Sequence, residues 1–332
     1  MSTNLTVAKS SLPNWIIAGA PKAATSSLFQ WLGDHPQVAV TEEKETYYFS
    51  DPGTHMFRLD RNYHDHGLEG YAMLFRDAPA SAAAIVEATP GYMYSDTALR
   101  VLPGLTSRPS FIFVLREPVA QLKSLYQYFR ENWNWIPRKM SFQDFIAASA
   151  AAQPIFKNNE LAQNAVANAH YETALRRWRD ACGLDRMHII LFEDLVTDKQ
   201  RVMRDLASKM DLNAAFYDSY TFPVENASYA ARSHVLQRLN IAVRAHLPKG
   251  RSYNVLRRIY RAVNTTATNL VQVAEPELEH ALSSSFEPTL DALETEFGLD
   301  VTKWRHAMAA RVAERGQNGK RDASQYAARQ HE

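Results

Sequence analysis

The sequence has little cysteine, little net charge and no long hydrophobic run. Cys182 is the only cysteine among 332 residues, so the chain forms no internal disulfide and no zinc cluster built on several thiolates. A single cysteine is typical of a reducing compartment. The formal net charge is +1, which provides no overall field to attract nucleic acid. We therefore expect no nucleic-acid partner, and any anion site has to come from a local cluster of basic residues.

The apolar runs are short. A run such as Phe111–Leu115 is far shorter than the roughly 20 residues that a membrane-spanning helix needs. The first fourteen residues are polar and lack the apolar stretch of a signal peptide. These features predict a cytoplasmic protein without a membrane span.

Short strand-like segments alternate with segments of helical pattern. Hydrophobic residues make up 46% of the chain, which is enough to bury the core of one large domain. Two of the segments are almost entirely apolar, as is typical of strands buried on both faces. Alternation of strands and helices predicts an α/β fold with a parallel sheet between layers of helices. The five predicted strands are Trp15–Ala20, Val38–Val40, Ala84–Ala88, Phe111–Leu115 and His188–Phe192.

The second half of the chain is predicted to be mainly helical. Amphipathic helices are expected over Tyr171–Cys182, Asp194–Met210 and Glu275–Phe297. The chain becomes polar and charged from about Arg305, which indicates a frayed helix or a disordered tail. We expect a flexible N-terminus over residues 1–13, one domain over residues 14–304 and a polar C-terminal tail over residues 305–332.

The first strand leads through small residues into a helix. Free backbone N–H groups at a helix N-terminus form an anion site, and Lys22 adds a full positive charge there. The Gly-Lys-Ser/Thr ending of a Walker A loop is absent, so a magnesium triphosphate is disfavoured. The alternative interpretation is a helix capped by Ser or Thr beside a surface lysine. The candidate anion-binding residues are Lys22, Ala23, Ala24, Thr25, Ser26 and Ser27.

A second candidate anion site follows the fourth predicted strand, which ends in Arg116-Glu117-Pro118. An arginine at the carboxyl end of a buried strand faces the crevice where open α/β sheets bind ligands. Its planar guanidinium can hold a phosphate through two parallel hydrogen bonds. Ser124, eight residues later, can supply a hydroxyl to the same phosphate. The alternative is a structural pair between Arg116 and Glu117.

Both motifs resemble those of sulfotransferases that depend on 3′-phosphoadenosine-5′-phosphosulfate (PAPS), especially the bacterial and heparan-sulfate-type branch. Residues 22–28 resemble the 5′-phosphosulfate loop, Lys-x-Gly-Thr-[Ser/Thr]-x-Leu, with Ala24 in place of the glycine. Arg116 and Ser124 resemble the 3′-phosphate motif, an Arg-[Asp/Glu]-Pro with a serine eight residues later. The resemblance implies a P-loop-like three-layer sandwich around a mainly parallel sheet of about five strands, with a helical C-terminal half. It also implies PAPS as the sulfuryl donor and no metal.

The resemblance extends to a candidate general base. Lys44-Glu45-x-x-Tyr48-Phe49 resembles a Lys-Glu-x-x-Phe-Phe stretch of the same branch, in which the glutamate takes the proton of the acceptor. It therefore implies Glu45 as the catalytic base, while Lys22 stabilises the leaving phosphate. The neighbouring Glu42 and Glu43 are otherwise typical of a solvated acidic patch.

Glu87 is a second carboxylate of interest, because a charge in a buried strand is costly unless it is paired or functional. Its surroundings resemble the family's Val-Glu-Lys-Thr-Pro-x-Tyr, with Ala88 in place of the lysine. Two interpretations stay open: a structural role, such as holding the Lys22 loop, or a contact with the acceptor.

Several functions remain open at this point. Arg232, which follows Asn226 and Ser228, is a candidate for closing over the nucleotide. The expected acceptor is a hydroxyl or an amine of a small molecule or a carbohydrate, and no pattern indicates an oligomeric state. The alternatives are a P-loop-type kinase or nucleotide phosphotransferase, and a nucleotide-binding protein without catalytic activity.

Overall fold

A five-stranded parallel sheet forms the centre of the protein. The computed structural model describes residues 12–132, 135–137, 139–223, 229–231, 265–267 and 276–311, so Arg232 lies outside the described residues. The sheet has the order β2-β3-β1-β4-β5, and all neighbouring strands are parallel. This arrangement confirms the predicted fold class and each predicted strand to within one residue at its ends. The strands are β1 (Trp15–Gly19), β2 (Val38–Val40), β3 (Ala84–Ala88), β4 (Ser110–Leu115) and β5 (Met187–Leu191).

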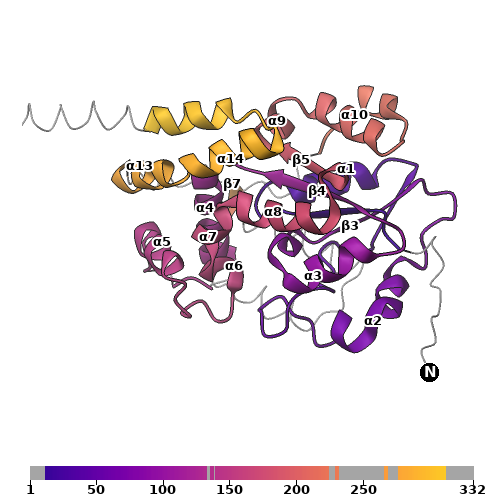
Figure 1. Ribbon diagram of the computed structural model, residues 1–332, viewed down its shortest axis with the longest axis horizontal. Helices are drawn as coiled ribbons and strands as arrows, with labels where there is room; N and C mark the ends of the chain where they lie inside the picture. The colour runs from indigo at the N-terminus through magenta and orange to yellow at the C-terminus, as the bar shows by residue number, and fades with distance from the viewer. Residues whose placement is uncertain are drawn as a thin grey trace, which may run out of the picture.

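Alternating residues of the sheet enter two separate hydrophobic cores. Ile16 of β1 and Phe111 of β4 face one core, together with Trp178 of α8 (Tyr171–Cys182). Ile17 of β1 and Ile112 of β4 face the other core, with α1 (Thr25–Gly33) and α10 (Lys199–Lys209). Because successive side chains of a strand point to opposite faces, near-continuous apolar strands require helices on both sides. The helices therefore form two layers around the sheet (Figure 1).

The remaining elements are short. The other helices before β5 are α2 (Tyr63–Ala72), α3 (Asp96–Val101), α4 (Pro118–Gln127), α5 (Phe142–Ala150), α6 (Glu160–Gln163) and α7 (Ala165–Ala169). The short 3₁₀ helices are η2 (Met73–Phe75), η3 (Pro90–Tyr94), η4 (Leu102–Gly104), η6 (Leu184–Arg186) and η7 (Ala214–Asp218), and η5 (Tyr128–Asn132) is a π-helical turn. A small antiparallel pair joins β6 (Tyr229–Ala231) and β7 (Thr265–Ala267).

Two of the predicted helices are each divided in two, so their prediction as single helices was wrong. Asp198 ends α9 (Phe192–Thr197), and its side chain accepts a hydrogen bond from the N–H of Arg201 and caps α10. Phe286 separates α13 (Pro276–Ser285) from α14 (Glu287–Phe297), and Pro288 lies in the first turn of α14. Proline and an aspartate cap both favour the start of a new helix. The hydrophobic pattern alone does not show these breaks.

A further helix over residues 302–311 follows α14 and is drawn in yellow in Figure 1. Trp304 is fully buried and Met308 is 2% exposed, so this helix packs on the core. Arg311 at its end pairs with Glu117. The helix passes through residue 304, where we expected the domain to end. None of the described helices is long and apolar enough to cross a membrane.

Candidate active site

The loop after β1 leads into α1 through two residues with left-handed backbone. Lys22 has φ 68° and Ala24 has φ 62°, a conformation that turns the chain sharply. Ala24 is the N-cap of α1, and no side chain caps the helix at that position. Thr25 and Ser27 in the first turn are buried, and Ser26 is half-buried. The alternative interpretation, a helix capped by Ser or Thr beside a surface lysine, does not match this geometry.

Two side chains, one directly after β4 and one on α4, donate hydrogen bonds to carbonyl oxygens of the loop between β1 and α1. Gln121 of α4 donates from Nε2 to the oxygen of Pro21 at 3.1 Å. Arg116, directly after β4, donates from Nη1 to the oxygen of Lys22 at 3.3 Å. Because β1 and β4 are neighbours in the sheet, their carboxyl ends bring these groups together.

Arg116 does not pair with Glu117. The carboxylate of Glu117 accepts hydrogen bonds from the N–H groups of Val119 and Ala120 and pairs with Arg311. The guanidinium of Arg116 lies 4.5 Å from the ring centre of Phe192, and its Nε has no hydrogen-bond partner among the described residues. Burial lowers the pKa of Arg116, although nearby Glu193 opposes the shift. The structural pair considered as the alternative is therefore absent.

Lys22 is the second cation at this edge of the sheet. Its Nζ lies 4.1 Å above the ring centre of Tyr128, and no carboxylate of the described residues forms an ion pair with it. Burial and, to a smaller extent, the charge of Arg116 lower the pKa of Lys22 to about 8, while the charge of Glu45 opposes the shift. Two neighbouring cations without a carboxylate partner form a favourable site for an anion with several charges.

Ser124 lies on α4 and is 4% exposed. It follows Gln121 by three residues, close to one helical turn, so both side chains project from the same side of α4. No hydrogen bond in the described part of the chain joins its hydroxyl to Arg116. Its contact with a phosphate stays a prediction, as does the role of Arg232.

Glu45 lies in the loop after β2 with a donor on each carboxylate oxygen. Lys44 Nζ is 2.5 Å from Oε1, and the hydroxyl of Tyr47 donates to Oε2. Burial acts to raise the pKa of Glu45. The charge and hydrogen bond of Lys44, the hydrogen bond of Tyr47 and the charge of Lys22 outweigh burial and lower the pKa below its ordinary value. Glu45 is therefore ionised at neutral pH and close to the Lys22 loop.

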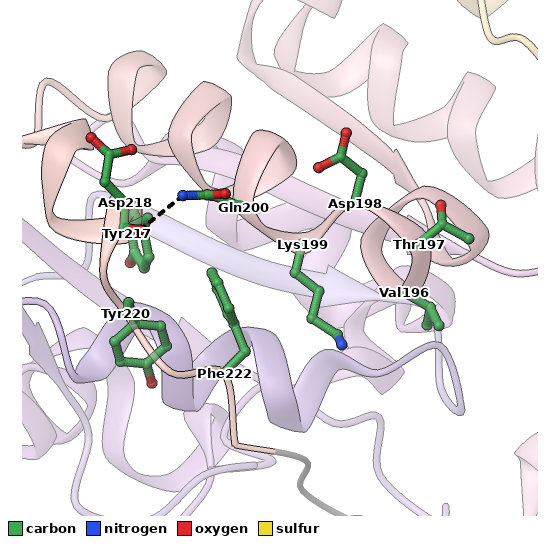
Figure 2. A pocket seen from close by; sticks show the side chains of 9 residues that line it. All are labelled: Val196, Thr197, Asp198, Lys199, Gln200, Tyr217, Asp218, Tyr220 and Phe222. Atoms are coloured by element: carbon green, nitrogen blue, oxygen red, sulfur yellow. Dashed lines mark hydrogen bonds between the residues drawn. The ribbon is translucent and has the colours of Figure 1, made fainter.

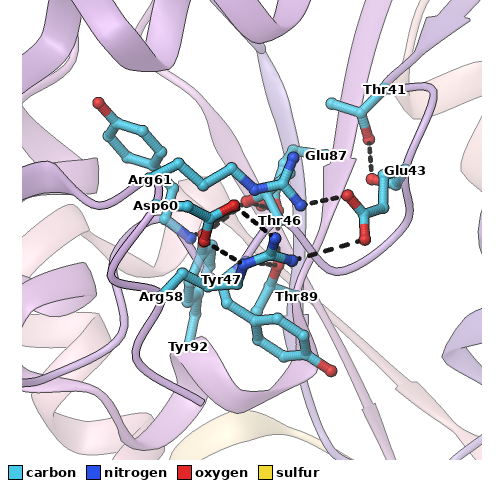
Figure 3. Close-up of polar contacts among 11 residues, drawn as sticks. Thr41, Glu43, Thr46, Tyr47, Arg58, Asp60, Arg61, Glu87, Thr89 and Tyr92 are labelled. Atoms are coloured by element: carbon cyan, nitrogen blue, oxygen red, sulfur yellow. Dashed lines mark hydrogen bonds and ion pairs between the residues drawn. The ribbon is translucent and has the colours of Figure 1, made fainter. Parts of the chain in front are cut away.

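The loop after β2 that contains Glu45, here called the Glu45 loop, forms hydrogen bonds with the end of β3. The N–H of Glu45 donates to the oxygen of Ala88 at 2.9 Å. The hydroxyls of Thr46 and Thr89 donate to Glu87 Oε1 at 3.0 and 2.6 Å, as Figure 3 shows. Glu87 is fully buried, and burial raises its pKa to about 7 while both hydroxyl bonds oppose the shift. These contacts favour the structural interpretation of Glu87, with the Glu45 loop as its partner and not the Lys22 loop.

Glu43 is also held by side chains and is not part of a solvated acidic patch. It pairs with Arg61 and lies 3.6 Å from Arg58, which also pairs with Asp60 (Figure 3). Glu42 is exposed. The charge of Lys22 is among those that lower the pKa of Glu45.

A model of the sulfotransferase family matches residues 13–216, which include Lys22, Glu45, Arg116 and Ser124. The chain belongs to the sulfotransferase family. It is 32% identical over 133 residues to the membrane-associated sulfotransferase kil1 of Dictyostelium discoideum, covering 39% of this chain and 25% of that protein. It is 26% identical over 210 residues to the bifunctional heparan sulfate N-deacetylase/N-sulfotransferase 2 of Bos taurus, covering 62% and 22%. The matches thus span about a quarter of the length of these relatives.

A solved structure has the same fold. The crystal structure of a sulfotransferase from Alicyclobacillus acidocaldarius matches with a TM-score of 0.63 at 20% identity, covering 88% of this chain and 98% of that one. At this identity the match establishes the α/β three-layer fold of this sulfotransferase-family chain.

Two residues that contact the predicted site, Tyr47 and Tyr128, were not predicted from the sequence motifs. Tyr47 occupies a variable position of the Lys-Glu-x-x-Phe-Phe stretch, so the resemblance gave it no role. Tyr128 belongs to none of the motifs. Its neighbours Tyr126 and Phe129 are each 1% exposed and belong to the core, whereas Tyr128 is half-buried beside Lys22. Only contacts in three dimensions distinguish these residues.

A surface groove of about 340 Å³ lies at the junction of α9 and α10 (Figure 2). Tyr217 and Phe222 form part of its wall, with Lys199 on the opposite side. None of the predicted site residues within the described ranges lines it. Within the described ranges, no group of three or more His, Cys, Asp or Glu side chains is arranged to hold a metal ion.

Proposed function

We propose that this protein transfers a sulfuryl group from PAPS to a hydroxyl or an amine of a small-molecule or carbohydrate acceptor, by in-line displacement. The observation that carries this proposal is the pair of cations at the ends of β1 and β4. Lys22 and Arg116 lie together without a carboxylate partner in the described part of the chain, and Arg116 bonds to the backbone of Lys22. Membership of the sulfotransferase family supports the same reaction.

In this proposal Lys22 and Arg116 bind different anionic groups of PAPS. Lys22 and the first turn of α1, with Thr25, Ser26 and Ser27, hold the 5′-phosphosulfate. Arg116 and Ser124 hold the 3′-phosphate, and Arg232 closes over it from the segment outside the described residues. A nucleotide with anionic groups at both ends needs two such sites, whereas a simple phosphate needs one.

The reaction follows from this placement. The acceptor oxygen or nitrogen attacks sulfur, the bond from sulfur to the bridging phosphate oxygen breaks, and adenosine 3′,5′-bisphosphate leaves. Glu45 takes the proton of the acceptor, and Lys22 stabilises the negative charge that develops on the leaving phosphate. Glu45 suits this role because Lys44, Tyr47 and Lys22 keep it ionised at neutral pH.

The acceptor class is taken from the chemistry and from the relatives. The bovine relative is named as an N-sulfotransferase of heparan sulfate, which makes a carbohydrate amine one class to test. Ala88 stands where the resemblance expects lysine, so the acceptor contacts differ at that position. The compartment stays a prediction from the sequence.

Calorimetry with adenosine 3′,5′-bisphosphate, without magnesium, tests the donor site. We expect binding to weaken on the order of 100-fold in Arg116→Ala, because two charge-assisted hydrogen bonds are lost. Arg186→Ala is the matched control, since Arg186 bonds only to the oxygens of Cys182 and Pro103 in the described structure. A preference for magnesium ATP over the bisphosphate contradicts the proposal and favours the kinase alternative.

Glu45→Gln separates catalysis from binding. The variant keeps the size of the side chain and is expected to bind the bisphosphate as the wild type does. Its release of bisphosphate from PAPS, with candidate acceptors or with water, is expected to fall by about 10²–10⁴-fold. Wild-type protein that binds PAPS and transfers to none of them fits the alternative of a nucleotide-binding protein without activity.

A further inference from the structure

We propose that Tyr47 is a positioning residue of the transfer reaction: its hydroxyl, bonded to Glu45 Oε2, fixes the orientation of the carboxylate that receives the proton. The proposal rests on the proposed role of Glu45 as the base. The motif that contains Glu45 leaves this position variable.

The hydrogen bonds around Glu45 carry the inference. Lys44 Nζ bonds to Oε1 and the Tyr47 hydroxyl bonds to Oε2, so each carboxylate oxygen has a different donor. Two donors on opposite oxygens prevent rotation of the carboxylate about its last bond. The Glu45 side chain is still 33% exposed. Each carboxylate oxygen has two lone pairs, so one remains for an acceptor that approaches from this open side.

The backbone brings the two side chains together. Glu45 has φ 65° and Tyr47 has φ 55°, so both adopt the left-handed conformation, which is uncommon outside glycine. Such conformations persist where surrounding contacts impose them. Here Thr46 between them is fixed to Glu87, and the N–H of Tyr47 faces Thr89 Oγ1 at 3.5 Å. The loop thus maintains two strained residues that place a phenol against a carboxylate.

Burial and the neighbouring charges keep the proton on the hydroxyl of Tyr47. Burial raises the pKa of Tyr47 well above its ordinary value, and the charge of Glu45, the hydrogen bond to it, Tyr128 and Glu43 raise it further. The phenol is therefore a donor throughout the physiological range. Lys44 and Lys22 are the cations that face Glu45 itself. Removal of the Tyr47 hydroxyl therefore leaves Lys44 and Lys22 near Glu45 and removes only one hydrogen-bond donor from its carboxylate.

The neighbouring tyrosine provides a matched comparison. Tyr48 is 1% exposed, and its hydroxyl donates to the oxygen of Gly67 at 2.8 Å, away from Glu45. Tyr47→Phe and Tyr48→Phe each remove one phenol hydroxyl and one hydrogen bond from the same loop. Only Tyr47→Phe removes a donor from Glu45.

Carbon-13 NMR titration of the glutamate carboxyl groups tests the proposal without any substrate. Glu45→Gln identifies the Glu45 resonance in protein labelled at the glutamate carboxyl carbon. We expect its midpoint to move up by about one pH unit in Tyr47→Phe, as for the loss of one hydrogen bond to the charged form, and to stay in place in Tyr48→Phe. An unchanged midpoint in Tyr47→Phe, or equal shifts in both variants, overturns the proposal.

A second measurement follows bisphosphate release from PAPS with water as the acceptor between pH 3.5 and pH 7, because the pKa of Glu45 lies below its ordinary value of 4.5. In Tyr47→Phe the acid limb of the rate is expected to move upward with the Glu45 midpoint, while the Kd of adenosine 3′,5′-bisphosphate stays within twofold of wild type. A lost affinity for the bisphosphate, or an unchanged acid limb, contradicts a positioning role. If the wild type itself does not bind the bisphosphate, the proposed function fails, whereas the NMR result still decides whether Tyr47 controls Glu45.

Discussion

Arg116 Nη1 donates a hydrogen bond to the backbone oxygen of Lys22 at 3.3 Å, across 94 positions of sequence. The contact exists because β1 and β4 are neighbours in the sheet and both end at the same edge. It places two half-buried cations close enough for Arg116 to lower the pKa of Lys22. An anion that lies between them relieves this repulsion, and the affinity for such an anion follows the charge of Lys22.

The affinity for adenosine 3′,5′-bisphosphate is expected to fall at alkaline pH. The pKa of Lys22 is about 8, so its ammonium is present below pH 8 and is lost as the pH rises through that value. The phosphates, with a second pKa of about 6, are already ionised in this range. We expect about tenfold weaker binding at pH 9.5 than at pH 7.5, measured by calorimetry.

Lys22→Arg provides the control for this pH dependence, because arginine stays charged throughout the range. Its affinity is expected to be nearly constant between pH 7.5 and pH 9.5. A wild-type affinity that does not change over the same range means that Lys22 does not titrate at the site.

Glu87→Gln is expected to change how stability depends on pH. The pKa of Glu87 rises from its ordinary value of 4.5 to about 7 in the folded protein. Between these values the unfolded chain loses the proton and the folded protein keeps it, so the free energy of unfolding decreases as pH rises. Ionisation of Glu87 should therefore lower the free energy of unfolding of the wild type by about 3 kcal/mol between acidic pH and pH 7.

Urea unfolding at pH 5, 6, 7 and 8 measures this dependence. The Gln variant should lack the part of the slope that comes from Glu87, whereas Glu69→Gln, at an exposed position on α2, should follow the wild type. Parallel slopes for Glu87→Gln and wild type rule out the raised pKa.

Arg311→Met is expected to destabilise the fold by about 1–3 kcal/mol. Arg311 bonds to both carboxylate oxygens of Glu117, which is 3% exposed and caps α4 directly after Arg116. Lys303→Met removes an exposed pair with Asp194 and should cost less than about 1 kcal/mol. Equal losses in urea unfolding would show that the pair of Arg311 with Glu117 stabilises the fold no more than an exposed ion pair does.

Gly19→Ala is expected to destabilise the end of β1. A Cβ at this position would lie 2.6 Å from Met93 Sδ and 2.8 Å from Met93 Cβ, so η3 has to move away from the strand. Such overpacking costs about 1–3 kcal/mol. Gly104→Ala has no heavy atom within 4 Å of the added Cβ and serves as the control in thermal unfolding. A wild-type melting temperature for Gly19→Ala contradicts the close packing of β1 on η3.

The local pattern was sufficient for the strands and for one long helix. β1 to β5 and α8 begin and end within one residue of their predicted bounds, because continuous apolar runs and a terminal Gly183 are strong local signals. The breaks at Asp198 and Phe286 were not predicted, because a cap or a proline redirects a helix without changing its hydrophobic period. The chain from Arg305 onward was expected to be a frayed helix or a tail, because the contact of Arg311 with Glu117 spans nearly 200 residues of sequence and leaves no local signal.

The sequence by itself determined the α/β class, the two strand-to-helix turns with Lys22 and Arg116, and the motif that contains Glu45. Each of these depends on residues close together in the chain: periodicity and spacing indicate the fold class and the turns, and the resemblance to a known family indicates the Glu45 motif. Only the tertiary structure decided which partner each charge has: Glu117 pairs with Arg311 and not with Arg116, Glu87 holds Thr46, and Tyr47 holds Glu45. Charge pairing depends on distances of a few ångströms between residues from different elements, and the packing of helices on the sheet sets those distances.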